Sequence, residues 1–382
     1  MLMNILLVTV NWDLVGGGGL ARFSKGVVQG LRELDHTVDV LIEDKQATAA
    51  DDAAILTVNS AASPLGRAWA FARGIVRYHK GRHYDAIICT TWSPGGTAAY
   101  LCHKWTGLPY WVMCHGNDVV EPQRSFFYAW LMARVLNGAQ GSLCNSRYTS
   151  RLVEQLGIAE DKIAVIGCGI DPDYLSQFVP PQAVLPAIDE HEHAIVLTVG
   201  RLVARKGQDM TIRALALITH KNPECRYIIV GEGPDRERLE RLSRDLNVEE
   251  NVVFTGFMSD AGVYALIQKC HVFVMASRDI REEGEVEGFG IVFLEAGYFE
   301  KPVIAGNAGG MADPVADDVS GFIVDARSPE EIADKIVRLL DNKDLSTEMG
   351  RAGRRRTLEE FTWNKVALRV HRALTAHGES HQ

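Results

Sequence analysis

Apolar residues in this chain fall into short β-branched runs that alternate with longer stretches of helical spacing. The runs that predict strands are residues 4–10, 37–42, 84–90, 110–113, 194–199, 226–230, 252–255, 271–275 and 302–305. Strands that alternate with helices along a chain favour βαβ units and parallel sheets. The pattern therefore predicts an α/β fold.

The alternation stops between Ile170 and His193 and resumes with a new strand at Ala194. The prolines of this gap are Pro172, Pro180, Pro181 and Pro186. A chain of 382 residues is long for one core, so we place a domain linker in this segment. The expected domains are residues 1–180 and 190–360.

A last helix is expected over residues 361–382. Trp363, Val366, Val370 and Leu374 follow one another at intervals of three and four, which gives the helix one apolar face. That face needs a surface to cover, and we expect the helix to pack back on the N-terminal domain.

Composition indicates a folded protein and argues against some classes of partner. Hydrophobic residues make up 47% of the chain and the formal net charge is -9, which favours a folded protein and argues against a general nucleic-acid partner. Seven cysteines without a CxxC pair are interpreted as reduced core residues. The apolar start lacks a basic leader region, and no run reaches the ~18 apolar residues of a spanning helix. We therefore expect a cytoplasmic protein, at most peripheral at the inner face of a membrane.

Four consecutive glycines, Gly16 to Gly19, lie between the first predicted strand and the helix expected near Leu20. Glycine backbone at this position can approach a ligand closely, so Gly17 and Gly18 are candidate binding residues. The cluster also holds a loose dinucleotide fingerprint, although five residues separate it from the strand. A flexible turn without function is the alternative for the same residues.

A basic loop, residues 200–207, directly follows the strand predicted over 194–199. Doubly wound sheets bind ligands at the carboxyl ends of their strands, and Arg201 and Lys206 there would suit phosphate oxygens. The alternative is a solvated loop with no ligand.

Residues 285–296 contain the strongest local signal. Gly288 and Gly290 precede a predicted helix whose first amides would suit a phosphate. Glu287 and Glu295 can each accept two hydrogen bonds from the vicinal hydroxyls of a sugar. Glu295 lies within an apolar run, where an unpaired carboxylate is costly, so a surface position without function is the weaker interpretation.

These motifs together resemble retaining GT-B glycosyltransferases, in the family of sucrose-phosphate synthase and bacterial mannosyltransferases. The features that carry the resemblance are the basic loop 200–207, Gly231 to Gly233, Phe254 with Gly256, and Glu287 with Glu295, in this order. Residues 285–296 are most similar to phosphatidylinositol-mannoside mannosyltransferases. The resemblance implies the GT-B fold, in which two Rossmann-like domains face each other across a cleft.

The resemblance also implies roles for the matching residues of the C-terminal half. Arg201 and Lys206 would bind the donor diphosphate, Glu287 the transferred sugar and Glu295 the ribose. The residues implied in phosphate and sugar binding through their backbone are Gly288, Phe289, Gly290 and Ile291. Those implied in lining the base pocket are Gly231, Gly233 and Phe257.

In the N-terminal half the resemblance is limited to the first strand, the glycine loop and His115. His115 would contact the donor sugar, and Gly17 and Gly18 would lie beside the donor. A lone histidine is more often structural, so its role depends on the resemblance.

The implied function is the transfer of a hexose from a nucleotide-diphosphate sugar to a lipid-linked or glycan acceptor, in envelope or exopolysaccharide biosynthesis. GDP-mannose is the favoured donor and a UDP-sugar is possible. The sequence shows no metal motif, so we expect no metal and no cofactor. The alternatives are a GT-B-fold sugar-nucleotide epimerase or hydrolase, a dinucleotide-dependent dehydrogenase, and a binding protein without catalysis.

Residues 64–84 bear on the partner of the N-terminal half. The basic residues of this segment are Arg67, Arg73, Arg77, Lys80 and Arg82, and the segment contains no acidic residue. Together with Trp69 and Phe71 they suit an anionic membrane surface. A crossover helix with a solvated basic face is the alternative.

Overall fold

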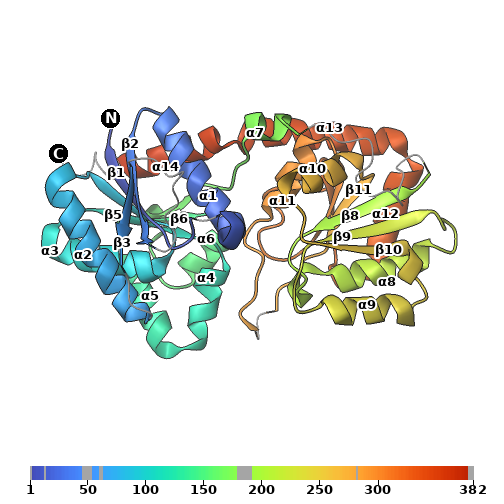
Figure 1. The fold of residues 1–382 in the computed structure, drawn as a ribbon, viewed down its shortest axis with the longest axis horizontal. Coiled ribbons are helices and arrows are strands. Elements are labelled where there is room, and N and C mark those ends of the chain that lie inside the picture. The colour runs from blue at the N-terminus through green and yellow to red at the C-terminus, as the bar shows by residue number, and fades with distance from the viewer. Residues whose placement is uncertain are drawn as a thin grey trace. The chain divides into compact units, whose positions relative to one another are not determined.

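The computed structural model describes residues 2–12, 14–44, 54–59, 63–178, 192–280 and 283–376. The chain forms two compact units, drawn in Figure 1. The N-terminal unit contains Met1–Gly169 together with Thr362–Gln382, and the C-terminal unit contains Ile170–Phe361. The chain thus returns to the first unit after completing the second.

The N-terminal unit is built on a seven-stranded sheet of order β3-β2-β1-β4-β5-β6-β7, and every neighbouring pair is parallel. The strands are β1 Asn4–Val8, β2 Thr37–Glu43, β3 Ile55–Val58, β4 Ala86–Cys89, β5 Tyr110–Cys114, β6 Gly141–Cys144 and β7 Ile163–Val165. The central strands are buried on both faces, which accounts for their uninterrupted apolar runs.

Helices cover both faces of this sheet. The helices are α1 Leu14–Glu33, α2 Pro64–Arg82, α3 Thr97–Thr106, α4 Asn117–Val120, α5 Phe126–Gly138, α6 Arg147–Glu154 and α14 Trp363–Ala376. Side chains of α2, α3 and α5 share one buried cluster with the strands, so these three helices form a layer over one face. Figure 1 shows this layer on one side of the sheet and α1 on the other.

The last helix, α14, packs along α1. Its apolar face of Trp363, Val366, Val370 and Leu374 is buried, as the spacing predicts. Gly26 and Gly30 of α1 face this helix, and a Cβ atom at Gly26 would overlap the Trp363 ring. The two helices approach closely because α1 has no side chains at these positions.

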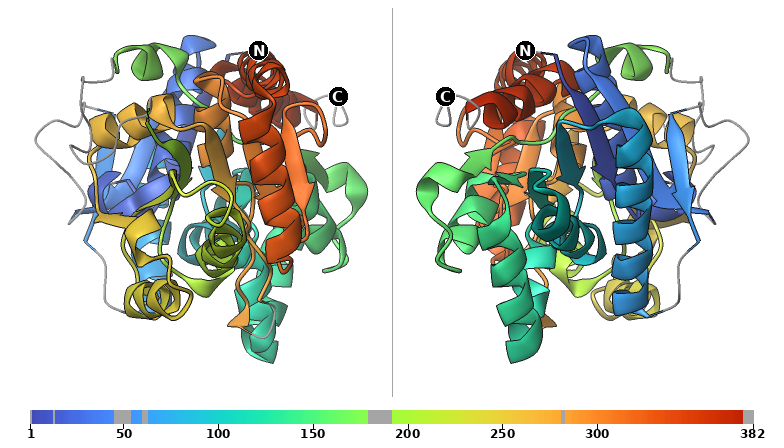
Figure 2. Two further views of the ribbon diagram at one scale, coloured as in Figure 1. Left: turned by 90° about the vertical axis from the view of Figure 1, so that its right-hand side faces the viewer. Right: turned by 90° about the vertical axis from the view of Figure 1, so that its left-hand side faces the viewer.

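The C-terminal unit has a six-stranded sheet of order β10-β9-β8-β11-β12-β13, again with parallel neighbours. The strands are β8 Ala194–Val199, β9 Cys225–Val230, β10 Val252–Gly256, β11 Val272–Met275, β12 Val303–Gly306 and β13 Gly321–Val324. The helices are α7 Pro172–Ser176, α8 Gln208–Ile218, α9 Arg236–Asp245, α10 Asp260–Lys269, α11 Ile291–Tyr298, α12 Pro329–Asp341 and α13 Lys343–Glu360. Figure 2 shows two further views of these elements.

The α/β class with parallel sheets is confirmed, while four strands lie outside the predicted set: β3, β6, β7 and β13. β3 and β7 are edge strands whose side chains are mostly only partly buried, so they carry a weak apolar pattern. β6 and β13 begin with glycine, a residue depleted in strands. The boundary between the units falls at Gly169, before the proline segment, and Pro180, Pro181 and Pro186 lie outside the described residues. All seven cysteines are free and buried.

The close approach of α1 and α14 gives a stability prediction. Gly26→Ala should lower the free energy of unfolding of the N-terminal unit by about 1–3 kcal/mol, because the added methyl group forces the Trp363 ring out of place. Gly81→Ala in α2 is the matched control, since no atom lies within 4 Å of its added Cβ atom. The control should leave stability unchanged or raise it by about 0.4–1 kcal/mol. Urea unfolding followed by circular dichroism measures both, and equal effects would contradict the packing described.

Candidate functional site

The basic loop lies where the sequence places it, at the carboxyl end of β8. Leu202 is fully buried and anchors the loop, and its N–H donates to the Glu232 carbonyl over 2.9 Å. The N–H of Asp235 donates in turn to the Leu202 carbonyl over 3.1 Å. The loop after β8 is therefore attached to the loop after β9 by its backbone.

Gly231 and Gly233 are required for this attachment. A Cβ atom at Gly231 would overlap the carbonyl oxygen of Gly200, and one at Gly233 would overlap that of Leu202. Any other residue would separate the two loops. The structure thus gives a packing reason for both glycines, and their place in a base pocket stays a prediction.

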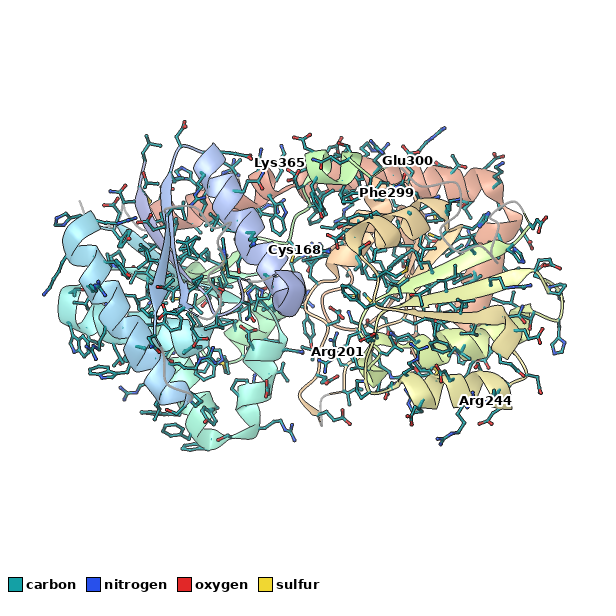
Figure 3. All side chains as sticks on the ribbon, viewed as in Figure 1. Cys168, Arg201, Arg244, Phe299, Glu300 and Lys365 are labelled. Atoms are coloured by element: carbon teal, nitrogen blue, oxygen red, sulfur yellow. The ribbon has the colours of Figure 1, made fainter. Side chains whose placement is uncertain are left out.

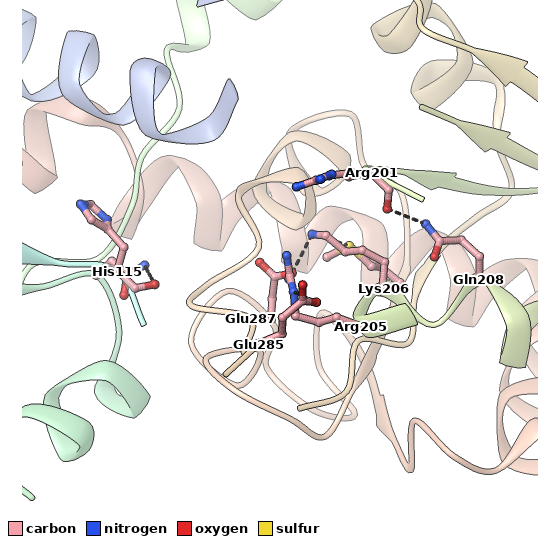
Figure 4. A network of polar contacts seen from close by, with 9 residues as sticks. His115, Arg201, Arg205, Lys206, Gln208, Glu285 and Glu287 are labelled. Atoms are coloured by element: carbon pink, nitrogen blue, oxygen red, sulfur yellow. Dashed lines mark hydrogen bonds and ion pairs between the residues drawn. The ribbon is translucent and has the colours of Figure 1, made fainter. Parts of the chain in front are cut away.

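Three charged side chains meet at the start of α8. The Lys206 Nζ atom lies 2.6 Å from Glu287 Oε2, and the Arg205 guanidinium donates to the same oxygen. The side chains of Arg205, Lys206 and Glu287 are only 14%, 13% and 12% exposed. Figure 4 shows the two cations converging on Glu287 from the loop after β8. We call these three residues the charged cluster.

The charged cluster keeps Glu287 ionised. Burial raises the pKa of the Glu287 carboxyl, but the positive charges of Lys206 and Arg205 outweigh burial, and the net result is a lowered pKa. An ionised carboxylate only accepts hydrogen bonds, so Glu287 offers acceptors to hydroxyl groups. The two cations beside it are suited to phosphate.

Arg205 is the residue that the assignment of roles from sequence missed. Besides Glu287 it has Glu285 nearby, with 3.7 Å between Arg205 Nε and Glu285 Oε2. Its carbonyl accepts a hydrogen bond from the Arg278 N–H over 2.9 Å. The acidic pair Glu285 and Glu287 was visible in the sequence, and it could have suggested a basic pair as its partner.

The segment Gly288 to Ile291 leads into α11, as its glycines predict. Gly290 is the N-cap residue with a left-handed backbone, and Ile291 is the first helical residue. Phe289 is 2% exposed and packs edge-on against the Phe361 ring at 5.7 Å. Phe289 is therefore a core side chain, and any contact with a ligand would come from the backbone.

Glu295 lies in α11 and is 4% exposed. Its Oε1 atom accepts a hydrogen bond from the Tyr264 hydroxyl over 3.0 Å. The buried carboxylate therefore has a protein partner, which weakens the argument that burial alone requires a ligand. The predicted ribose contact stays a prediction.

Arg201 and Phe257 are both exposed. The Arg201 carbonyl accepts a hydrogen bond from Gln208 Nε2 over 3.1 Å, which fixes the backbone while the guanidinium reaches solvent. Phe257 follows β10 and is 75% exposed. Figure 3 marks Arg201 among the side chains of its unit. Both side chains are available to a ligand.

His115 follows β5 in the N-terminal unit. Its ring Nε2 atom lies 2.9 Å from the Thr90 carbonyl oxygen. The backbone N–H of His115 donates to Asp118 Oδ1 over 2.7 Å. Burial lowers the pKa of the ring, against the opposing charge of Asp118, so the ring is neutral at pH 7. Because a carbonyl only accepts, Nε2 carries the proton and Nδ1 is the acceptor of the ring.

Gly17 and Gly18 lie within α1, which begins at Leu14 instead of near Leu20. The helix is broken at Gly18, where φ is 52° and ψ is -136°. No atom lies within 4 Å of a Cβ atom placed at Gly18. The predicted loop is thus a kinked helix start with open space beside the backbone.

In the described part of the chain no three His, Cys, Asp or Glu side chains come together as metal ligands would.

Two family models match the chain. The model described as "Glycosyltransferase Family 4" matches residues 17–174, and "Glycosyl transferases group 1" matches residues 187–356. A GDP-mannose-dependent alpha-(1-6)-phosphatidylinositol monomannoside mannosyltransferase of Mycobacterium tuberculosis is 34% identical over 245 residues. This match spans 63% of the present chain and 63% of the length of the relative.

Solved structures show the same fold. Sucrose-phosphate synthase from Thermosynechococcus elongatus superposes with a TM-score of 0.81 at 22% identity, over 99% of this chain and all of that one. Anabaena HepE in complex with UDP superposes with a TM-score of 0.79 at 20% identity, over 98% of this chain and 100% of that one.

The two parallel sheets and these neighbours define the GT-B fold. The chain belongs to the GT-B glycosyltransferases, with one family model on each half and mannosyltransferases among its relatives.

The charged cluster predicts a stability effect. Glu287→Gln should lower the free energy of unfolding of the C-terminal unit at neutral pH by about 1–3 kcal/mol, because two buried cations lose their counter-charge. Because the pKa is lowered, the stabilisation is fully present above the unfolded-state pKa and is lost as the pH falls through the folded-state pKa. The difference between wild type and variant should therefore shrink in acid.

The control is Glu240→Gln. The Glu240 carboxylate is more exposed than that of Glu287, and its Oε1 atom lies 2.8 Å from Arg236 Nε. Its effect should stay within about 0.5 kcal/mol. Urea unfolding across a pH series measures both variants, and a Glu287→Gln effect no larger than the control would refute the charged cluster.

Proposed function

We propose that this protein transfers a hexose from a nucleotide-diphosphate sugar to a lipid-linked or glycan acceptor in envelope or exopolysaccharide biosynthesis, with retention of anomeric configuration. The observation that carries the proposal is the charged cluster beside the carboxyl end of β8, in which Lys206 and Arg205 pair with the ionised carboxylate of Glu287. A lysine there suits phosphate oxygens, and an ionised carboxylate suits the hydroxyls of a sugar.

Donor binding is assigned to the C-terminal unit. Arg201 and Lys206 bind the diphosphate, because charge-assisted hydrogen bonds to phosphate are short and strong. Backbone amides at the start of α11 contribute further partial positive charge beside the diphosphate. Glu287 accepts hydrogen bonds from hydroxyls of the transferred sugar, and Glu295 accepts from the ribose. Gly231, Gly233 and Phe257 border the base.

His115 contributes an acceptor from the N-terminal unit. Its neutral ring keeps the proton on Nε2, which is engaged by the Thr90 carbonyl. Nδ1 then accepts a hydrogen bond from a donor-sugar hydroxyl, and Gly17 and Gly18 lie beside the donor. The role of His115 is to position the sugar, since the ring has no proton to give at Nδ1.

The transfer step needs no enzyme nucleophile. The acceptor hydroxyl oxygen bonds to the anomeric carbon on the face from which the diphosphate departs, while the bond from that carbon to the phosphate oxygen breaks. The hydroxyl proton passes to the departing phosphate oxygen. Arg201 and Lys206 stabilise the charge that develops on the diphosphate, and positioning supplies most of the remaining rate enhancement.

GDP-mannose is the favoured donor, because the mycobacterial relative at 34% identity is named as GDP-mannose-dependent. A UDP-sugar is the second candidate, since a solved neighbour of the same fold binds UDP. The name of the mycobacterial relative also favours a phosphatidylinositol mannoside as the kind of acceptor.

A panel of nucleotide sugars tests the donor. In a thermal-shift series, GDP-mannose at 100 times its dissociation constant should stabilise the protein by about 2.7 kcal/mol. Arg201→Ala and Lys206→Ala should each weaken donor binding about tenfold or more, since each loses a charge-assisted contact. Arg213→Ala, an exposed position on α8, is the matched control and should bind like wild type.

Wild-type binding in both the Arg201 and the Lys206 variant would refute the assigned diphosphate site. A time course without acceptor addresses the reaction class: a transferase leaves the donor nearly intact, whereas an epimerase or hydrolase converts it.

Transfer should continue in excess EDTA. Arg201, Lys206 and the α11 amides provide the positive charge that a bound metal ion would otherwise supply to the leaving group. The rate of product formation with and without EDTA measures this directly. Activity that disappears and returns with added Mg²⁺ or Mn²⁺ would show that the site needs a metal.

A further inference from the structure

The helical layer of the N-terminal unit exposes an unusual set of aromatic side chains. They belong to α2, α3 and α5, which pack on one face of the sheet, as the right-hand view of Figure 2 shows. The exposed aromatic residues are Trp69 at 51%, Trp105 at 56%, Phe126 at 89%, Phe127 at 55%, Tyr128 at 45% and Trp130 at 47%. We call them the aromatic surface.

Five of the six aromatic side chains of this surface form two groups of rings in contact. The Trp69 and Trp105 rings meet edge-on at 5.5 Å, which joins α2 to α3. The Phe127 ring lies 5.7 Å from Tyr128 and 6.2 Å from Trp130. Elsewhere in the described residues only Tyr174 and Phe257 are comparably exposed aromatic side chains. The concentration of the rest on one helical layer indicates an interaction surface.

Positive charge accompanies the aromatic surface. The exposed cations on the same helices and on the preceding turn Glu121–Arg124 are Arg73, Arg77, Lys80, Arg82, Lys104, Arg124 and Arg134. The Arg134 guanidinium lies over the Trp130 ring at 4.9 Å. Across residues 64–138 the acidic residues are only Asp85, Asp118 and Glu121, in a chain with a net charge of -9. The surface is thus basic on an acidic protein.

The structure shows that two of the five cations of residues 64–84 are held in ion pairs within the N-terminal unit. Arg67 donates to both oxygens of Glu43, over 2.7 and 2.9 Å, and Arg82 pairs with Asp39 at 2.6 Å. These two arginines therefore connect α2 to β2 through ion pairs. On α2, Arg73 and Arg77 instead follow Trp69 at intervals of four, so all three lie along one exposed stripe.

We propose that the aromatic surface docks on an anionic phospholipid bilayer. Tryptophan and tyrosine favour the level of the lipid headgroups, phenylalanine enters the acyl boundary, and Lys and Arg bind anionic headgroups. A second copy of the chain fits less well, because the exposed cations of both copies would face each other. None of the helices in the described part of the chain is long and apolar enough to cross a membrane, so attachment is at the surface. The proposal does not depend on the transfer reaction.

Sedimentation with vesicles tests the proposal. Wild-type protein should sediment with vesicles of phosphatidylglycerol and phosphatidylcholine in equal parts, and much less with phosphatidylcholine alone. Added salt should weaken attachment, because exposed charges are screened beyond ~8 Å at physiological ionic strength. The triple variant Arg73→Glu, Arg77→Glu, Lys80→Glu should lose affinity on the order of a hundredfold.

The matched charge control is the triple variant Arg213→Glu, Arg241→Glu, Arg244→Glu, which makes the same charge change at exposed positions of the C-terminal unit. It should sediment nearly as wild type does. A second triple variant, Phe126→Ser, Phe127→Ser, Trp130→Ser, should lose attachment at least tenfold. Its control replaces Leu217 and Val319, exposed at 51% and 55%, with serine. Circular dichroism verifies that each variant is folded.

Three outcomes would overturn the proposal. Wild-type protein could stay in the supernatant with anionic vesicles at low salt. The control variants could lose attachment as much as the surface variants do. Light scattering could show a wild-type dimer that the Phe126→Ser, Phe127→Ser, Trp130→Ser variant abolishes, without vesicle binding, which would assign the surface to self-association. Each outcome leaves the donor-binding assays unaffected, so the two proposals fail separately.

Discussion

The pairing of Glu287 with Lys206 and Arg205 is the interaction on which the candidate site depends. Taking a carboxylate and two cations largely out of water is costly for each one alone, and the cost is offset only when the three remain together. The pairing therefore holds the loop after β8 against the segment that leads into α11. Gly231 and Gly233 complete the arrangement by letting the loop after β9 approach the loop after β8.

This constraint prepares the site before a ligand arrives. Both cations already converge on Glu287, and Glu287 is already ionised, so the proposed binding of a diphosphate and a sugar would need little reorganisation. In the proposed site Lys206 would divide its charge between Glu287 and the phosphate, which would link recognition of the sugar to recognition of the diphosphate. The protonation state of His115 in the N-terminal unit is likewise set by the protein, because burial favours its neutral form and the Thr90 carbonyl fixes its tautomer.

Much of the fold was accessible from sequence, since long β-branched runs such as those of β8 and β9 are typical of strands buried on both faces of a parallel sheet. Short strands such as β7 were not, because three residues carry no periodicity. At the site, the glycines before α11 predicted the helix start, while the role of Arg205 depends on a partner 82 residues away that only folding reveals. The hydrogen bond from Tyr264 to Glu295 and the pairing of Arg67 with Glu43 were hidden for the same reason.

In the proposed function the donor binds to the C-terminal unit through the loop after β8 and the start of α11. Hydrogen exchange followed by mass spectrometry, with and without GDP-mannose, tests it most directly on the full chain. We expect slower exchange in peptides covering residues 200–207 and 285–295, whose amides would lie beside the bound diphosphate and sugar. Protection that appears only in the N-terminal unit, or in neither peptide at saturating donor, would rule out this donor site.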